Sequence, residues 1–217
     1  DPVQKGCQLL ADILYKITDE HKDIGLQVGI VANGTFKEHL EDIVEMHELH
    51  DRVAIVDFSE KMSHLGYAAA DFMMMPSYFE PCGLPQMVAP KYGTIPVVHD
   101  TGGIHDTVEP LNYEKTEGNG FSFQHYSSEG LKWAVDEAVH FYKQPTDFKE
   151  NVIKRIMNEA NARFNHEVTA GEYISRYEQI LGEKVTKPKE ETKPKAKKKA
   201  TKKASKKATK KTAKKSS

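Results

Sequence analysis

Apolar and polar positions repeat at two different periods along this chain, and the two periods follow each other in turn. After Lys5 the apolar residues recur at helical spacing, which predicts an amphipathic helix: Leu9, Leu10, Ile13, Leu14 and Ile17. Residues 25–34 (GLQVGIVANG) form a short apolar run that ends in Asn-Gly, which predicts a strand and a turn. The chain is therefore expected to open with a helix followed by a strand.

The next elements repeat this order. Helices are expected at 36–49, 61–70 and 84–92, and strands at 52–58, 71–77 and 94–99. In the first of these helices the inward positions are expected to be Leu40, Ile43, Val44 and His47. The strand at 71–77 (DFMMMPS) is apolar on both faces, as expected of a buried strand in a parallel sheet.

The last predicted elements are a strand at 120–123 and helices at 128–143 and 147–181. Inward positions in these helices are expected at Trp133, Val135, Ala138, Val139 and Tyr142. Strands that alternate with helices predict an α/β fold, a Rossmann-like parallel sheet with helices on both faces. Because such a domain usually opens with a strand, the chain is expected to begin just after its first strand and to lack a preceding domain.

Charge divides the chain into a body, residues 1–182, and a tail, residues 183–217. The whole sequence has a formal charge of −1, but the tail holds 16 Lys and three Glu, a formal charge of +13. Its Lys, Ala, Thr and Ser repeats contain no aromatic residue, so the tail is expected to be disordered. Two interpretations stay open: non-specific, salt-sensitive contact with nucleic-acid phosphates, and a solubilising or self-associating extension that shields the acidic body.

Cysteine and histidine usage argues against several classes of protein. Cys7 and Cys82 have no metal-ligand or redox spacing and make no disulfide scaffold, which favours a reducing, cytoplasmic location. The ten histidines show no paired ligand spacing, so no metal site is expected. No apolar run approaches the ~20 residues of a membrane span, so no membrane partner is expected. The sequence does not predict the oligomeric state.

Four polar loops follow predicted strands: ANGT, DFSE, PSYFEPCG and HDTGG. They are expected to gather at one edge of the sheet, because ligands bind at the carboxyl ends of parallel strands. In the third loop a Gly-containing turn leads into a helix, whose free N–H groups suit an anion. Glu80 would repel that anion unless it binds a hydroxyl group. The loop therefore predicts a ligand that carries both phosphate and a polyol.

The motifs FEPCGLPQ (79–86), KYGTIPVV (91–98) and DTGGIHDTV (100–108) resemble those of the bacterial glycogen synthase and plant starch synthase family. QKG (4–6) and HLGYAAADFMMMPS (64–77) match further motifs in the same order, so the resemblance covers roughly residues 1–181. These enzymes have two Rossmann-like domains, an architecture called GT-B, and the chain resembles the C-terminal, nucleotide-sugar-binding one. The resemblance implies transfer of glucose from ADP-glucose to the non-reducing end of an α-1,4-glucan, with retention and without a metal or further cofactor.

The resemblance also implies a role for residues that face the donor phosphates. Lys5 matches a lysine that faces the pyrophosphate, where a cation would stabilise the charge that builds on the leaving group. Backbone N–H groups around Gly83 and Leu84 would add to this stabilisation from the start of a helix.

Further roles implied by the resemblance concern the sugar and the base. Glu80 matches a glutamate that holds sugar hydroxyls and stabilises positive charge on the glucose ring. Cys82 and Gly83 would contact the sugar mainly through their backbones. Phe58 lies where the family places an aromatic ring against adenine. The same cleft would be lined by Thr101, Gly102 and Gly103.

Three positions depart from the family pattern. The phosphate-binding arginine that precedes the QKG motif in the family is absent. Pro85 has no N–H to donate to phosphate, although proline suits a first helical turn. Val88 stands where related retaining transferases have the second acid of a Glu-x7-Glu pattern. Acceptor-side residues are expected in the domain that the chain lacks, so the chain alone is expected not to elongate glucan.

These residues also have interpretations that do not invoke the family. Glu80 would cap a helix or lie on the surface, and Lys5 would be a solvated lysine. Cys82 would be a small buried residue and Phe58 part of the core. Histidines near the cleft are expected to be hydrogen-bonded structural residues: His64, His99 and His105. Two alternatives for the whole chain are a retaining transferase of the same architecture that uses a UDP-sugar, and a nucleic-acid-associated protein that acts through its tail.

Overall fold

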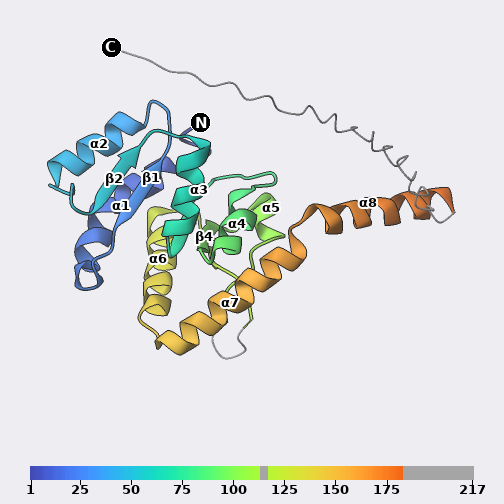
Figure 1. Ribbon diagram of the computed structural model, residues 1–217. Coiled ribbons are helices and arrows are strands. Elements are labelled where there is room, and N and C mark those ends of the chain that lie inside the picture. Colours follow the sequence, from blue (N-terminus) through green and yellow to red (C-terminus); the bar gives the residue numbers. More distant parts are fainter. Residues whose placement is uncertain (113–116, 183–217) are drawn as a thin grey trace, which may run out of the picture. The chain divides into compact units, whose positions relative to one another are not determined.

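The computed structural model describes residues 1–112 and 117–182, and Figure 1 shows the arrangement of their helices and strands. In chain order the strands are β1 (Val28–Val31), β2 (Val53–Val56), β3 (Phe72–Met75), β4 (Ile95–His99) and β5 (Phe121–Phe123). The α-helices are α1 (Cys7–Glu20), α2 (Lys37–Met46), α3 (Glu60–Ala69), α4 (Pro85–Val88), α5 (Gly102–His105), α6 (Ser128–Tyr142), α7 (Thr146–Arg163) and α8 (His166–Leu181). Short 3-10 helices occur at η1 (Lys22–Ile24) and η2 (Ala89–Tyr92).

Asp1–Ser175 form one compact unit, and a second unit begins at Arg176. The structure describes only residues 176–182 of this second unit. The predicted disorder of the tail, 183–217, therefore concerns residues outside the described part and stays a prediction. Within residues 1–112 and 117–182, no helix has both the length and the apolar character that crossing a bilayer requires.

The strands pair in parallel, which confirms the predicted α/β class. β1 pairs with β2, and β4 lies between β3 and β5. In the described part of the chain β1 and β3 are not paired with each other, so the predicted single sheet is divided into two sheets. The chain passes from one sheet to the other through α3, between β2 and β3. Among the described residues, β1 and β3, like β2 and β5, thus each have one edge without a neighbouring strand.

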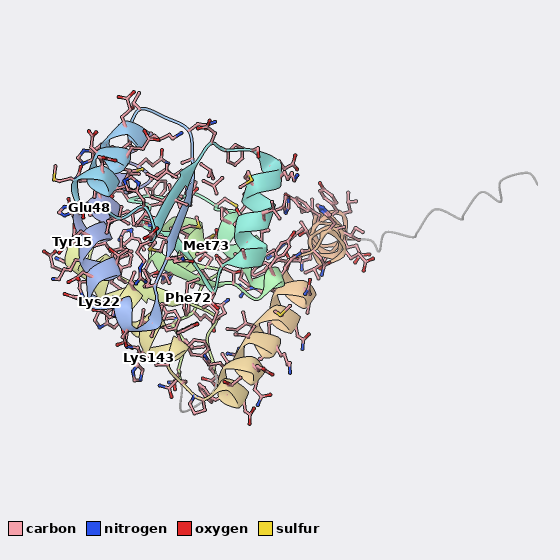
Figure 2. All side chains as sticks on the ribbon, turned by 60° about the vertical axis from the view of Figure 1, so that its left-hand side comes forward. Tyr15, Lys22, Glu48, Phe72, Met73 and Lys143 are labelled. Carbon is pink, nitrogen blue, oxygen red and sulfur yellow. The ribbon has the colours of Figure 1, made fainter. Side chains whose placement is uncertain are left out.

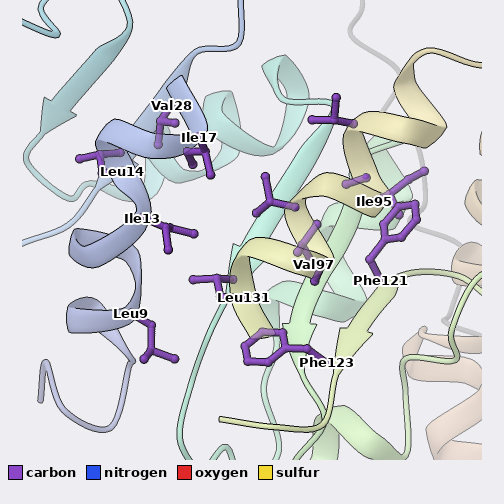
Figure 3. Close-up of a cluster of buried hydrophobic side chains, with 14 of the residues drawn as sticks. Leu9, Ile13, Leu14, Ile17, Val28, Ile95, Val97, Phe121, Phe123 and Leu131 are labelled. Atoms are coloured by element: carbon purple, nitrogen blue, oxygen red, sulfur yellow. The ribbon is translucent and has the colours of Figure 1, made fainter. Parts of the chain in front are cut away.

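Helices cover both faces of the sheet that contains β4, as predicted. Successive residues of its strands point to opposite faces. Met74 packs with Val97 in a large apolar cluster to which α1, α2 and α6 also contribute, and Figure 3 shows part of this cluster. Met73 packs instead with Val98 and Ile104, in a smaller cluster that includes α5. The prediction that this run of methionines is apolar on both faces is therefore confirmed.

Helix α1 is fixed on one side by α2 and on the other by α6. Tyr15 stacks on His47, with ring centroids 4.3 Å apart, and Figure 2 shows Tyr15 close to the end of α2. On the α6 side, His21 Nε2 lies 2.9 Å from Asp136 Oδ1. The turn that precedes α1, which contains Lys5, is consequently attached to a helix whose position is set by two neighbours.

Three residues that were predicted to face inward do not. Trp133 is 54% exposed and Tyr142 is 37% exposed. Trp133 lies two positions after the fully buried Leu131, and two residues in a helix correspond to roughly 200°, so the two side chains point in nearly opposite directions. The ring of Tyr142 lies under the ammonium group of Lys149. His47 is also exposed, although it stacks on α1.

Two predicted helices are divided in the structure. The helix expected at 84–92 is one α-helical turn, α4, followed by η2, because Pro90 has no N–H with which to continue an α-helix. The helix expected at 147–181 is interrupted at Phe164, whose φ of −102° and ψ of 70° are not helical. Asn165 Oδ1 then accepts a hydrogen bond from Val168 N at 2.9 Å and caps α8.

Candidate functional site

The candidate site is built on a contact between the turn before α1 and the loop after β3. Lys5 Nζ lies 2.6 Å from Glu80 Oε2. The Glu80 side chain is only 12% exposed, whereas that of Lys5 is 54% exposed. A carboxylate that is largely removed from water needs a partner, and Lys5 supplies it.

Gly6 makes this contact possible. Its φ of 69° lies in the left-handed region, and a Cβ atom at this position would lie 1.9 Å from the carbonyl oxygen of Pro76. Hydrogen bonds from Tyr78 N to Gln4 O (2.8 Å) and from Gln4 Nε2 to Phe79 O (3.3 Å) join the same two segments. The glycine of QKG is therefore needed because the two backbones approach so closely.

The loop after β4 packs against the same segment through its two glycines. Gly103 N donates a hydrogen bond to Glu80 O at 2.9 Å. A Cβ atom at Gly102, where φ is 48°, would lie 2.2 Å from that oxygen, and one at Gly103 would lie 2.4 Å from Cys82 O. The structure thus brings together Lys5, Glu80, Cys82 and the Gly-Gly pair, as the position of the loops predicted.

Gln86 is a site residue that sequence reasoning missed. Its side chain is fully buried, and its Nε2 donates to the carbonyl oxygens of Cys82 (2.9 Å) and Gly83 (3.2 Å). Gly83 has a φ of 71°, and a Cβ atom there would lie 2.4 Å from Gln86 Oε1. Gln86 therefore fixes the backbone that was expected to contact the sugar. The sequence feature that could have indicated Gln86 is its position as the last residue of the motif FEPCGLPQ.

Three other predicted site residues lie in separate segments: after β2, at the start of α4 and at the start of α5. No hydrogen bond links Phe58, Leu84 or Thr101 to the Lys5–Glu80 pair within the described residues. Phe58 follows β2 and is 56% exposed, so its interpretation as a core residue is wrong. Cys82 is also exposed, which contradicts its interpretation as a small buried residue.

A side-chain amide joins the loops after β1 and β2. Phe58 N donates to Asn33 Oδ1 at 2.9 Å. This bond fixes the backbone of Phe58 while its ring remains accessible to a ligand. Asn33 belongs to the loop ANGT, which was expected at the ligand-binding edge.

The short length of α4 changes the electrostatics expected near Gly83 and Leu84. α4 has four residues. Because a helix dipole is the sum of aligned peptide dipoles, a single turn adds little beyond its own N–H groups. Any attraction of an anion to this segment would come from individual backbone N–H groups and from Lys5.

Each of the three histidines near the cleft makes a hydrogen bond, as predicted. Nδ1 of His64 lies 2.9 Å from a tyrosine hydroxyl, and Nδ1 of His99 lies 2.8 Å from Ser77 O. Nδ1 of His105 lies 2.7 Å from Asp100 Oδ1. This hydrogen bond, together with the carboxylate charge, raises the pKa of His105 above its ordinary value.

Among residues 1–112 and 117–182, no three His, Cys, Asp or Glu side chains lie close enough together to hold a metal ion. A cavity of about 630 Å³ lies elsewhere, lined by Glu109, Arg155 and Arg163 among others, and neither Lys5 nor Glu80 contributes to it. The chemistry that the candidate site offers is therefore a cation, an acid and closely packed backbone amides. Such groups suit a ligand that carries phosphate and hydroxyl groups.

The class of protein follows from comparison with known families. The model of the glycosyl transferases group 1 family matches residues 3–155, and the chain belongs to this family. It is similar to the glycogen synthases of Bacillus subtilis (strain 168), at 36% identity over 180 residues, and of Finegoldia magna, at 41% over 181 residues. These alignments cover 82% of this chain but only 35% and 36% of the relatives. The chain thus spans about a third of the length of the curated relatives it matches.

A solved structure gives the same result. The catalytic domain of starch synthase IV from Arabidopsis thaliana, bound to ADP and acarbose, matches with a TM-score of 0.66 and 29% identity. The match covers 83% of this chain and 36% of that chain. The resemblance to glycogen and starch synthases that was inferred from the motifs is therefore confirmed, and so is the GT-B-like fold.

Gly102→Ala is expected to destabilise the chain by about 1–3 kcal/mol, because the new Cβ atom would meet Glu80 O and the backbone would be strained at positive φ. Urea unfolding measures this change. Gly171→Ala is the matched control, since a Cβ atom there has nothing within 4 Å. Its stability should be unchanged or slightly higher. Equal stability of the Gly102 variant and the unaltered chain would show that the close contact with Glu80 is not maintained.

Asp100→Asn is expected to lower the pKa of His105, because it removes the charge that favours the imidazolium. The folded-state pKa of His105 is raised, so stabilisation by the pair is complete at pH values below the unfolded pKa and is lost as the pH rises through the folded pKa. NMR titration of the imidazole resonances measures the shift. An unchanged pKa of His105 in the variant would contradict the contact.

Proposed function

We propose that residues 1–182 are the nucleotide-sugar-binding, C-terminal domain of an ADP-glucose-dependent glycogen or starch synthase. The reaction is transfer of glucose to the non-reducing end of an α-1,4-glucan with retention of configuration. The observation that carries this proposal is the Lys5–Glu80 pair, 2.6 Å apart, with Glu80 in the loop after β3, in a chain similar to glycogen synthases. It provides one group for phosphate and one for hydroxyls.

In the proposed reaction the pair exchanges partners when the donor binds. The exposed Lys5 side chain turns toward the pyrophosphate, where it stabilises the negative charge of the leaving nucleoside diphosphate. Glu80 then accepts hydrogen bonds from the sugar and stabilises positive charge on the ring. The backbones of Cys82 and Gly83, with Thr101 and the Gly102–Gly103 pair, border the sugar. No metal and no cofactor other than the donor substrate take part.

The choice of ADP-glucose rests on similarity and on one side chain. The similar starch synthase IV domain is bound to ADP. Phe58 is exposed in the loop after β2 and offers a ring on which adenine can stack. A UDP-sugar remains the alternative donor, because an exposed ring can also stack on uracil.

The expected preceding strand and domain are part of the same proposal. Support comes from the divided sheet: β1 and β3 each have an unpaired edge in the described part of the chain, and unpaired edges favour the addition of a strand. A parallel strand between them would join the two sheets, with α1 as a right-handed crossover to β1. Acceptor-binding residues would belong to the preceding domain.

The tail supplies a second candidate activity. Its formal charge of +13 favours non-specific contact with nucleic-acid phosphates, and a solubilising or self-associating role is the alternative. Either role would leave the transferase chemistry to the body. The proposed location is the cytoplasm.

In the complete gene product, Glu80→Gln and Lys5→Gln are each expected to reduce glucose transfer from ADP-glucose to glycogen by roughly 10²–10³-fold, as loss of one charge-stabilising group does elsewhere. Incorporation of labelled glucose measures the rate, with UDP-glucose as the second donor. Glu129→Gln and Lys16→Gln are matched controls at exposed positions and should retain full activity.

Outcomes of this experiment separate the candidate functions. Faster transfer from UDP-glucose than from ADP-glucose would show that the donor is a UDP-sugar and would leave the proposed GT-B architecture unchanged. Absence of transfer from both donors by a folded protein would overturn the proposed reaction. Residues 1–217 alone should not elongate glucan, and turnover by this chain would show that acceptor binding needs no further domain.

Removal of residues 183–217 is expected to abolish binding to duplex DNA, because the acidic body would repel it. Fluorescence anisotropy at increasing salt concentration measures the affinity, which should fall steeply with salt for the longer chain. Binding that persists after truncation, or that is insensitive to salt, would exclude the tail as the contact.

A further inference from the structure

Glu80 has a second protein partner besides Lys5. Ser77 Oγ donates to Glu80 Oε2 at 3.4 Å, and Ser77 is only 2% exposed. Both hydrogen bonds that the described residues make to this carboxylate end on Oε2. The other oxygen, Oε1, is therefore the one left for a hydroxyl group of a ligand.

Ser77 is itself held through its backbone. His99 Nδ1 lies 2.8 Å from Ser77 O, and because a carbonyl oxygen only accepts, Nδ1 carries the proton and donates. His99 is 7% exposed, and its ring contacts those of Phe123 and Tyr126, with centroid distances of 5.3 and 5.0 Å. The position of Ser77 is thus determined by a buried, well-packed imidazole.

The two partners of the Glu80 carboxylate, Lys5 and Ser77, differ in how easily each can move away from it. The Lys5 side chain is half exposed and flexible, and a pyrophosphate would attract it more strongly than one carboxylate does. Ser77 is buried, and its hydroxyl faces no comparable competitor. When Lys5 turns to phosphate, Ser77 is the protein donor that remains on Oε2. At 3.4 Å its hydrogen bond is long, so it has room to shorten once the ammonium group leaves.

We infer that Ser77, supported by His99, is a positioning residue for Glu80. Ser77 retains Oε2 while Lys5 faces the donor phosphates, and this directs Oε1 toward a hydroxyl group of the sugar. The inference rests on the proposed function for the identity of the ligand. Ser77 and His99 act through Glu80 and need no contact with the donor.

Binding of ADP and ADP-glucose to the 217-residue chain tests this inference by calorimetry. Ser77→Ala should weaken the binding of ADP-glucose about fivefold, as expected for the loss of one hydrogen bond. The affinity for ADP should be unchanged, because ADP lacks the sugar. In a Glu80→Ala background, which removes the acceptor, the same substitution should have no further effect on the binding of ADP-glucose. A merely structural role for Ser77 would weaken both ligands and would persist in that background, and either result overturns the inference.

Variants at His99 test the support of Ser77. Asn places an amide N–H close to the position of Nδ1, so His99→Asn should bind ADP-glucose nearly as well as the unaltered chain. His99→Leu has no donor and should reproduce the selective loss of Ser77→Ala. Ser128→Ala is the matched control, because Ser128 Oγ also bonds a carboxylate, that of Asp12 at 2.6 Å. Ser128→Ala should change neither the affinity for ADP nor the affinity for ADP-glucose.

A ligand-free measurement separates this inference from the proposed function. In urea unfolding, a double-mutant cycle of Ser77→Ala and Glu80→Ala should show a coupling of at least about threefold in the unfolding equilibrium constant. If the unaltered chain bound neither ligand, this domain's proposed function would fail, while the cycle would still decide whether Ser77 positions Glu80. Strictly additive effects in the cycle would overturn the positioning role.

Discussion

The whole site depends on the approach of the Gly6 backbone to the carbonyl oxygen of Pro76. A Cβ atom on Gly6 would lie 1.9 Å from the Pro76 oxygen, and a Cβ atom on Gly102 would lie 2.2 Å from the carbonyl oxygen of Glu80. The segment from Pro76 to Glu80 is therefore held between two glycine backbones that come from distant parts of the chain. Because neither contact tolerates a side chain, the positions of Lys5 and Glu80 follow from backbone packing rather than from their own attraction.

This packing gives the Lys5–Glu80 pair a particular electrostatic character. A buried carboxylate beside an exposed ammonium group is neutral as a pair, and either member alone would attract a different ligand group. In the proposed reaction, donor binding would cost the free energy of this ion pair and would regain it through phosphate and hydroxyl contacts. If those contacts strengthen as charge separates on the donor, the site stabilises the transition state more than the bound substrate.

Strong local periodicity was enough to predict most of the fold, and the failures have identifiable physical causes. The alternating clusters around Met73 and Met74 followed from strand periodicity, but Trp133 was misplaced because apolar character alone does not say which helix face is covered. Motifs located Glu80 and its glycines. They could not reveal the link from His99 to Ser77, because that hydrogen bond joins β4 to the loop after β3 and exists only in the folded chain.

The divided sheet and the candidate site are parts of one arrangement. β1 and β3 run parallel within their own sheets, and α1 leads directly into the segment before β1. A strand placed between them and followed by α1 would end where residues 1–6 lie, beside the loop that contains Glu80. Lys5 would then occupy the loop between that strand and α1, the position from which a parallel sheet presents groups to a ligand. The same strand would thus both close the sheet and fix the cation of the site, so the proposed domain organisation and the proposed chemistry depend on one structural element.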